Sequence, residues 1–473
     1  MKKKYILTIL HNQTLSEAFL LDKKAQIVGH GQQEIEPIKR SSTHIEYDPL
    51  DIIYSIRSAI HKSLKSNQID AEEIASIGIS TDAHTTVIWD KQTGLPYHNC
   101  TAKNLEGTTP ICQQLSRDRI DDSIRERTGL SLTQDAPATL LKWLMDTNPD
   151  LQHHLKKKTL MLGTLDTWIL YNLTGRTTHK TDRTHASKTL LMNLKETQWD
   201  PFLLKEFHLN HAILPEIMPS QADFGTTQHF VPLPDGIPIV TLCEKDSARL
   251  IGTSGFNFGQ AKLSFENTGE FLINTGTDCP EITPHANPTL IANGATPHYG
   301  LHAKIPFPNM DIPWFPQLTK LTNPLSEAPP NSVHILPTDT HKMTLSGLHA
   351  GTTAEELTHA YFEAIVFQTN TTLRQLESEH RLYLKELKAD GPLSSNNHLL
   401  QFQADILQLP VIRMAEPQTQ ALGTALLTGL NSGFFKDKQD IQKHLKIDRT
   451  FLPSMDPISS LSRYNQWKRF QTL

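Results

Sequence analysis

Apolar residues recur with the spacing of strands and helices through the first half of the chain. Tyr5–Leu10 and Ala18–Asp22 carry the residues of two paired strands around a polar turn at residues 11–16. Asp48 and Pro49 precede isoleucines at positions 52, 53, 56 and 60, which predicts a helix with proline in its first turn. Ile74–Ser80 and Thr85–Asp90 predict two more strands. These patterns indicate an α/β half.

The second half follows the same course from strands to mixed elements. Strands are expected at Ala261–Phe265 and Glu270–Asn274, and Thr353 with Glu356 forms a capping box ahead of a helix. A further strand and helix are expected at 387–389 and from Asn396 onward. A chain of 473 residues is too long for one core. We therefore predict two layered α/β domains, residues 1–240 and 241–473.

Composition limits the classes of partner and the cellular compartment that we expect for this chain. The net charge of −5 provides no basic surface for nucleic acid. The apolar run near the start ends at His11, and no run approaches the roughly 20 residues of a membrane helix. Neither nucleic acid nor a membrane is therefore an expected partner. Four cysteines without CxxC spacing favour a reduced, cytoplasmic chain, and the histidines lack the spacing of metal ligands, so no metal site is predicted.

The stretch from residue 159 to residue 193 is the most distinctive. A short strand at Leu160–Leu162 leads through Gly163, which we expect to end it, into a helix at Thr164–Leu173. Short polar side chains then follow in the sequence Thr-Asp-Arg-Thr-His-Ala-Ser at 181–187, which is typical of a loop that bonds its own backbone. This long, irregular pattern resembles the GT-x-D-T-W … TD-x-T-x-AS signature of the glycerol kinases, within the FGGY family of sugar and polyol kinases.

The resemblance extends over almost the whole chain. Near the end, Asp390-Gly391 and the run from Asn396 to Leu407 fall in the family's order. The resemblance implies a pair of ribonuclease-H-like domains, as in actin and hexokinase, with nucleotide in the cleft between them.

The positions that would bind phosphate depart from the family. Phosphoryl transfer needs a loop around the phosphates, carboxylates that hold Mg²⁺, and a base for the hydroxyl proton. The family's first loop, D-Q-G-T-T-S-x-R, corresponds to residues 10–17: its metal-side carboxylate is Leu10, its glycine is Asn12 and its arginine is Glu17. Only Thr14 is kept, and Thr268 and Asn396 are the other expected remnants of nucleotide binding.

The catalytic and polyol-binding positions depart as well. The family's G-D-Q-Q-A-A motif corresponds to residues 244–249, which puts Lys245 at the position of the base and Asp246 at that of a substrate glutamine. A protonated lysine cannot accept a proton, and Asp246 is the alternative base if the turn shifts by one residue. The rest of the degenerate polyol pocket comprises Ala83, His84, Lys103 and Asp135. The family's G-G-A turn has become Gly391-Pro392-Leu393.

Residues typical of packing are thus retained, and residues that would contact ATP, metal or polyol are replaced. We predict a catalytically inactive glycerol-kinase-like protein with a regulatory, binding or scaffold role, without a cofactor. Its expected partner is a second copy of itself or an active kinase relative, and its small-molecule ligand is unknown. The alternative is an ATP-dependent phosphotransferase acting on glycerol or another polyol or sugar, with Mg·ATP and altered active-site chemistry. That enzyme would use the polar cluster of Asp82, His84, Lys103, Asp135, Lys245 and Asp246.

Overall fold

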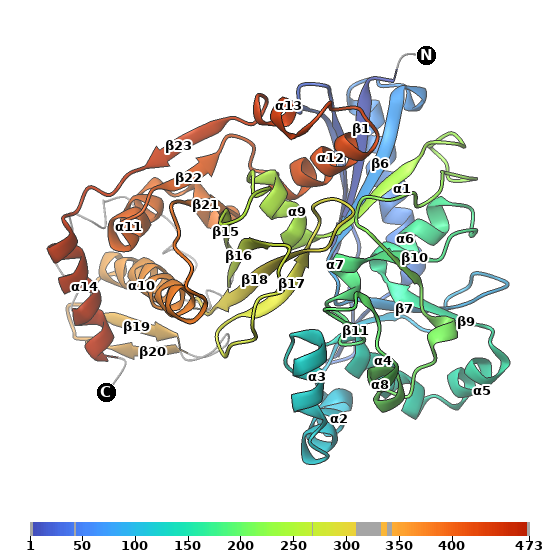
Figure 1. Cartoon of the computed structure of the whole chain (residues 1–473), viewed down its shortest axis with the longest axis horizontal. Coiled ribbons are helices and arrows are strands. Elements are labelled where there is room, and N and C mark those ends of the chain that lie inside the picture. Colours follow the sequence, from blue (N-terminus) through green and yellow to red (C-terminus); the bar gives the residue numbers. More distant parts are fainter. Residues whose placement is uncertain (1–2, 42–43, 267, 309–332, 338–342, 471–473) are drawn as a thin grey trace.

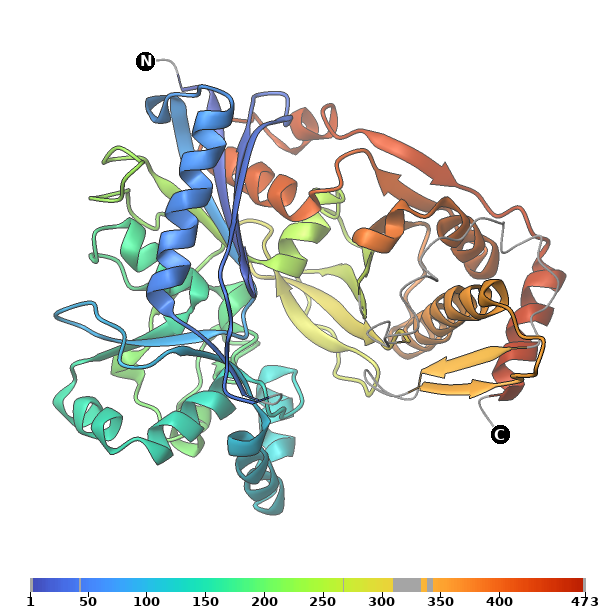
Figure 2. The ribbon, with the colours of Figure 1, turned by 180° about the vertical axis from the view of Figure 1, so that it is seen from behind.

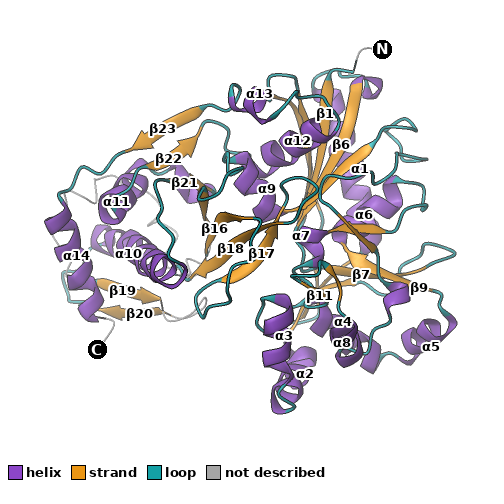
Figure 3. Cartoon of the chain, viewed as in Figure 1, coloured by secondary structure: helices purple, strands orange, loops and turns teal. Residues whose placement is uncertain are grey.

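The computed structural model describes residues 3–41, 44–266, 268–308, 333–337 and 343–470. Two halves stand side by side, the first coloured blue to green and the second yellow to red (Figure 1). Strands and helices are interspersed in both halves (Figure 3), which confirms the predicted α/β class. Within the described residues, no helix is long and apolar enough to cross a membrane.

The first half is built on a five-stranded sheet. Its order is β3 (Ile27–Glu34), β2 (Leu15–Leu21), β1 (Tyr5–Asn12), β6 (Ile74–Thr81) and β14 (Ile239–Glu244). The first three strands form an antiparallel meander, whereas β1, β6 and β14 run parallel. Parallel strands need crossover connections, and the connection that leads to β6 supplies one of the helices that cover the sheet.

Two helices pack on this sheet from opposite sides. Helix α1 (Pro49–Ser66) lies in front of the sheet in Figure 2 and buries the predicted isoleucine stripe. Helix α12 (Thr419–Asn431) comes from the far end of the sequence and contacts β1, β6 and β14. Gly78 of β6 permits this contact, because a Cβ there would lie 2.1 Å from Thr428 Oγ1 of α12. The first sheet therefore depends on a helix from the second half.

The second half repeats the strand arrangement. Its seven-stranded sheet has the order β17 (Asn287–Ile291), β18 (His298–Ile305), β16 (Gly269–Gly276), β15 (Ala261–Phe265), β21 (Leu387–Asp390), β22 (Val411–Met414) and β23 (Ile447–Phe451). The five central strands, β18 to β22, match the first sheet in order and direction: an antiparallel meander followed by two parallel neighbours. This repeat confirms the expected pair of similar domains.

The remaining elements flank these sheets. A second sheet of the first half has the order β4 (Ile38–Lys39), β5 (His44–Tyr47), β8 (Cys100–Asn104), β7 (Thr86–Asp90) and β9 (Leu160–Thr164). The two-stranded pairs are β10 (Lys180–Asp182) with β13 (Glu216–Met218), β11 (Met192–Asn193) with β12 (Gln198–Trp199), and β19 (His334–Pro337) with β20 (Met343–Ser346). The other helices are α2 (Leu105–Arg117), α3 (Ile120–Thr128), α4 (Pro137–Thr147), α5 (Pro149–Lys157), α6 (Leu165–Leu173), α7 (Arg183–Ala186), α8 (Pro201–Glu206), α9 (Lys245–Gly252), α10 (Ala354–His380), α11 (Asn397–Leu407), α13 (Lys438–Gln442) and α14 (Pro457–Arg469).

Most local predictions agree with these bounds, and three need correction. The stretch at 181–187, predicted as a loop, contains the end of β10 and the short helix α7, because Asp182 accepts hydrogen bonds from the backbone of Thr184 and His185 and so starts a helix. The capping box of Thr353 and Glu356 is present at α10. Gly163 lies inside β9 and does not end it. The first turn is tighter than expected, since β1 continues to residue 12 and β2 begins at residue 15, and only Gln13 and Thr14 lie between them. Backbone hydrogen bonding thus extends both strands into polar residues, which a hydrophobic pattern does not assign to a strand.

The predicted domain boundary lies inside a strand. Residues 240 and 241 both belong to β14, which pairs with β6 as far as the contact of Glu244 with Thr81. The division into residues 1–240 and 241–473 therefore stays a prediction. The first sheet continues beyond residue 240, because β14 pairs with β6 as far as Glu244. An apolar strand does not reveal from its sequence which sheet it joins.

Candidate functional site

The hairpin between β1 and β2 lies where the resemblance puts the family's first phosphate loop, and its side chains contact other parts of the protein. Leu10 is only 2% exposed. The His11 ring is buried against Ser16, with 2.8 Å between Nδ1 and Oγ, and burial lowers the pKa of His11 to about 4. Asn12 donates a hydrogen bond of 3.0 Å to Gln420 of α12. These contacts tie the hairpin to β2 and to α12.

A cavity of 610 Å³ opens beside this hairpin, between it and the ends of β21 and β22. The charged residues that line it are five carboxylates and two guanidinium groups: Glu17, Glu266, Asp390, Glu416, Asp448, Arg249 and Arg413. They come from segments spread over the whole chain, so the sequence alone did not identify most of them as neighbours. Asp390 was noted only as part of the retained Asp390-Gly391 pair.

Both arginines of the cavity are held by carboxylates of the protein. Arg249 pairs with Glu266 at 2.6 Å, and Arg413 contacts Asp448 at 2.6 Å through Nη2 and 2.7 Å through Nε. Burial opposes the charge of Arg249, but Asp390 and Glu266 outweigh it and raise the pKa of its guanidinium. After these pairings the carboxylates of the lining still outnumber its guanidinium groups, so the cavity carries net negative charge.

Lys245 and Asp246 stand at the start of α9, directly after β14. Glu244 caps this helix by accepting hydrogen bonds from the backbone of Asp246 at 2.9 Å and Ser247 at 3.3 Å. Burial opposes the charge of Lys245, yet the carboxylates of Asp246 and Glu266 raise the pKa of its ammonium. A cation at this position cannot serve as a general base.

Asp246 is bonded to a buried lysine that the sequence analysis did not single out. Lys262 of β15 is fully buried, and its Nζ lies 2.8 Å from Asp246 Oδ1 and 2.7 Å from Ser264 Oγ. Burial favours the neutral carboxyl, but Lys262 and Lys245 hold the pKa of Asp246 well below its usual range. A carboxylate with so low a pKa is a weak proton acceptor, so the geometry does not favour the alternative base.

Asp246 also belongs to a group of possible metal ligands. Donor atoms of Asp246, Glu270 and His302 lie within 4.8 Å of one another, and all three residues are buried. His302 Nε2 lies 2.8 Å from Glu270 Oε2, and this contact outweighs burial and lowers the pKa of Glu270 to about 2. Lys262 already supplies a cation to Asp246, and Glu270 is paired with His302, so the three groups have partners within the protein.

The polyol-pocket positions surround one turn. Asp82 fixes this turn by accepting hydrogen bonds from the backbone of His84 at 3.0 Å and Thr85 at 3.3 Å. Ala83 is buried, whereas the side chains of His84 and Asp135 are exposed. Loss of hydration lowers the pKa of His84. The negative charges of Asp82 and Asp135 oppose this decrease, and the positive charges of Lys304 and Lys245 add to it. These charged groups therefore lie in one region. The side chain of Lys103, on β8, lies outside the described part of the structure.

The three expected nucleotide-binding remnants have structural contacts, and the described cavity lining includes none of them. The carbonyl oxygen of Thr14 accepts a hydrogen bond from Ile35 at 2.8 Å. Thr268 donates to Glu270 at 3.1 Å. Asn396 caps α11 by accepting from His398 at 2.9 Å and from the next residue at 3.1 Å. Their retention is therefore explained by local structure as well as by the resemblance.

The turn after β21 closes the cavity on one side. Gly391 has φ +85°, and a Cβ there would lie 2.7 Å from the Phe265 carbonyl oxygen, so only glycine fits. Pro392, which follows, has no backbone N–H to offer a ligand and lines the cavity.

Comparison with known proteins assigns the family. The sequence model of the N-terminal domain of the FGGY family of carbohydrate kinases matches residues 5–252, and that of the C-terminal domain matches residues 322–432. The glycerol kinases of Alkaliphilus oremlandii and Limosilactobacillus reuteri are each 33% identical to this chain over 99% of its length, covering 96% and 97% of their own.

Solved structures show the same fold. The Plasmodium falciparum glycerol kinase with ADP has a TM-score of 0.90 at 24% identity, covering 100% of this chain and 98% of its own. The gluconate kinase from Lactobacillus acidophilus has a TM-score of 0.86 at 19% identity, covering 99% and 98%. With the repeated sheets, the matching domains and this full-length similarity, the chain belongs to the FGGY family of carbohydrate kinases, and its sequence is glycerol-kinase-like.

Proposed function

We propose that this protein is a glycerol-kinase-like pseudoenzyme, which does not phosphorylate glycerol and acts by binding or regulation. The charge of the cavity is the observation that carries the proposal. Five carboxylates and two guanidinium groups line it, so negative charge remains after Arg249 and Arg413 are paired with Glu266 and Asp448. Two like charges about 4 Å apart near a protein surface repel by about 4 kcal/mol.

These residues do not fit Mg·ATP. A triphosphate needs backbone approach and cations at the hairpin, where Asn12 and Glu17 stand, and Mg²⁺ needs an oxygen ligand where the buried Leu10 stands. Lys245 is a cation at the position of the base, and loss of a base alone costs about 10²–10⁴ in rate. We therefore expect no cofactor.

We propose a binding or regulatory role because the fold is retained while the residues of the nucleotide site do not suit Mg·ATP. The protein would act in the cytoplasm through contacts with a second copy of itself or with an active kinase relative. Such a role requires the packing residues of both domains, which are the ones that are kept.

A phosphotransferase with altered chemistry is the second candidate. It is favoured by the cavity of 610 Å³, which persists beside the hairpin, and by relatives named glycerol kinase that align over 99% of the chain. The solved glycerol kinase of the same fold holds ADP. Under this alternative, Mg·ATP would be the cofactor and glycerol or another polyol or sugar the substrate.

One assay separates the two candidates. ADP release is measured with Mg·ATP and a panel of glycerol, other polyols and sugars, with the Limosilactobacillus reuteri glycerol kinase as the active control. We expect no release above the buffer rate with any acceptor. Acceptor-dependent turnover near the 1–100 s⁻¹ typical of kinases would overturn the proposal and establish the alternative.

A further inference from the structure

Three lysines from different elements have ammonium groups without partners. Lys188 follows α7, Lys245 begins α9, and Lys304 belongs to β18. In the described part of the chain, none of the three ammonium groups has a hydrogen bond or an ion pair. Lys304 is exposed, whereas Lys188 and Lys245 are half-buried and their Nζ atoms keep contact with solvent. Each ammonium group has three N–H donors, so a ligand that supplies acceptor atoms can bond to all three lysines.

Strand register places Lys304 on the face of the second sheet that meets α9. Glu270 of β16 lies directly opposite Lys304, and His302, two residues before Lys304, shares its face. The register of β15 with β16 puts Lys262 on this face as well, and its Nζ lies 2.8 Å from Oδ1 of Asp246 in the first turn of α9. The start of α9 therefore lies against the face that carries Lys304.

Helix α7 brings Lys188 to the same place. The backbone N–H of Glu244, the residue before Lys245, donates a hydrogen bond of 2.8 Å to Thr184 of α7. Burial lowers the pKa of Lys188, the carboxylate of Glu244 opposes this decrease, and the positive charge of Lys304 adds to it. The ends of α7, α9 and β18 thus present their lysines to one region.

The buried carboxylates of this region are already bonded within the protein. Asp246 is paired with Lys262, and Glu270 is paired with His302. Glu244 accepts hydrogen bonds from the backbone of α9. The three lysines therefore keep donors that no carboxylate of the region uses, and an anion bound between them would gain charge-assisted hydrogen bonds.

His302 adds a position for a hydroxyl group. A carboxylate only accepts hydrogen bonds, so Nε2 of His302 donates the bond of 2.8 Å to Glu270. Burial and the charge of Lys188 lower the pKa of His302, which favours the neutral ring and leaves Nδ1 as an acceptor. Among the described residues this nitrogen has no partner, and it keeps contact with solvent. A hydroxyl group that donates to Nδ1 would lie beside the ammonium groups.

We propose that Lys188, Lys245 and Lys304 bind the phosphate of a small phosphate monoester, and that a hydroxyl group of the same ligand donates to Nδ1 of His302. Phosphate suits the lysines better than carboxylate does. A phosphate ester offers three acceptor oxygens and about two negative charges to separate ammonium groups, whereas a planar carboxylate matches the fork of an arginine. The inference rests on the proposed function, because an active kinase would bind a polyol phosphate only as a product to be released.

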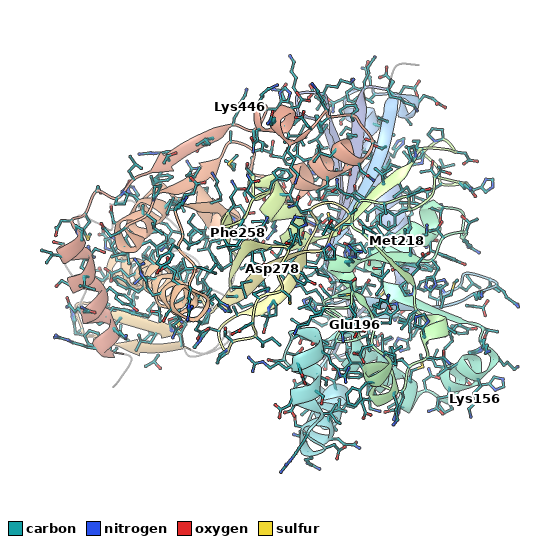
Figure 4. The ribbon with its side chains drawn as sticks, in the orientation of Figure 1. Lys156, Glu196, Met218, Phe258, Asp278 and Lys446 are labelled. Carbon is teal, nitrogen blue, oxygen red and sulfur yellow. The ribbon has the colours of Figure 1, made fainter. Side chains whose placement is uncertain are left out.

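Glycerol 3-phosphate is the probe, and its calorimetric titration into the full chain, without nucleotide or Mg²⁺, is the measurement. We expect one site per chain, and weaker binding of methyl phosphate, which lacks a free hydroxyl group. Lys304→Gln should weaken the binding of glycerol 3-phosphate by about tenfold, the effect of one lost charge-assisted hydrogen bond. The matched control is Lys156→Gln, the same change at an exposed lysine of α5 that is labelled in Figure 4. It should leave the affinity unchanged.

Melting curves verify that the variants fold, and Lys188→Gln supplies a second variant, for which weaker binding is expected. The absence of heat with glycerol 3-phosphate would overturn the inference, as would equal affinity in the Lys304→Gln and Lys156→Gln variants. Binding of glycerol, methyl phosphate or glycerate as tightly as glycerol 3-phosphate would also overturn it, because each lacks the phosphate or the hydroxyl group. Acceptor-dependent ADP release is a separate measurement, so failure of the proposed function and failure of phosphate-ester binding give different results.

Discussion

A buried imidazolium in α7, within the retained Thr-Asp-Arg-Thr-His-Ala-Ser stretch at 181–187, should make the stability of the fold depend on pH. His185, Asp166 and Asp182 are all fully buried. Nδ1 of His185 lies 2.5 Å from Asp182 Oδ1 and 3.7 Å from Asp166 Oδ2, and its Nε2 lies 2.9 Å from Thr81 Oγ1. Burial alone would lower the pKa of His185, but the two carboxylates outweigh it and raise the pKa to about 9.

The size and sign of the effect follow from linkage. The unfolded chain has the ordinary histidine pKa of 6.5, so the folded state holds the proton up to a pKa of about 9. Each pH unit between the two values corresponds to about 1.4 kcal/mol. The contribution to the free energy of unfolding is fully present below pH 6.5 and is lost as pH rises through 9, a total of about 3 kcal/mol.

Urea unfolding at a series of pH values between 6.5 and 9, followed by tryptophan fluorescence, measures this loss. The comparison is the double variant His185→Asn/Asp166→Asn, which keeps the net charge of the site and removes the ion pair. The wild-type protein should lose about 3 kcal/mol more than this variant over the range. His179→Asn is the control, because burial lowers the pKa of His179 to about 4 and its ring stays neutral throughout. Parallel curves for the wild type and the double variant would refute the reasoning.

Three further outcomes are expected. Gly423→Ala should lower the free energy of unfolding by about 2 kcal/mol or more, because its Cβ would lie 1.8 Å from the Ala248 carbonyl oxygen and force α9 and α12 apart. An unchanged urea midpoint would contradict this packing. Lys262→Met should cost about 3 kcal/mol in the same assay, because it leaves Asp246 buried and less compensated, and a more stable variant would disprove that account. Lys245→Asp alone should leave glycerol-dependent ADP release at background, because the hairpin and cavity still lack the groups for Mg·ATP, whereas recovery would show that nucleotide and polyol bind productively.

The sequence by itself determined the local elements and the family. The isoleucine stripe predicted α1, the capping box predicted the start of α10, and the signature at 159–193 indicated the family that the comparisons establish. These features are local or strictly ordered along the chain, so periodicity and motif spacing are enough to find them. The replacements at Leu10, Glu17 and Lys245 are visible for the same reason, since each stands at a fixed place in a motif.

The tertiary structure alone decided which charges meet. Lys262 and Asp246 are 16 residues apart on β15 and α9, and their pairing disfavours Asp246 as the alternative base, which the sequence had left open. Glu17, Asp390 and Glu416 line one cavity although β2 belongs to the first sheet and β21 and β22 belong to the second. Strand pairing also assigned β14 to the first sheet. Charge pairing and sheet membership are properties of distance in space, and hydrophobic periodicity carries no information about them.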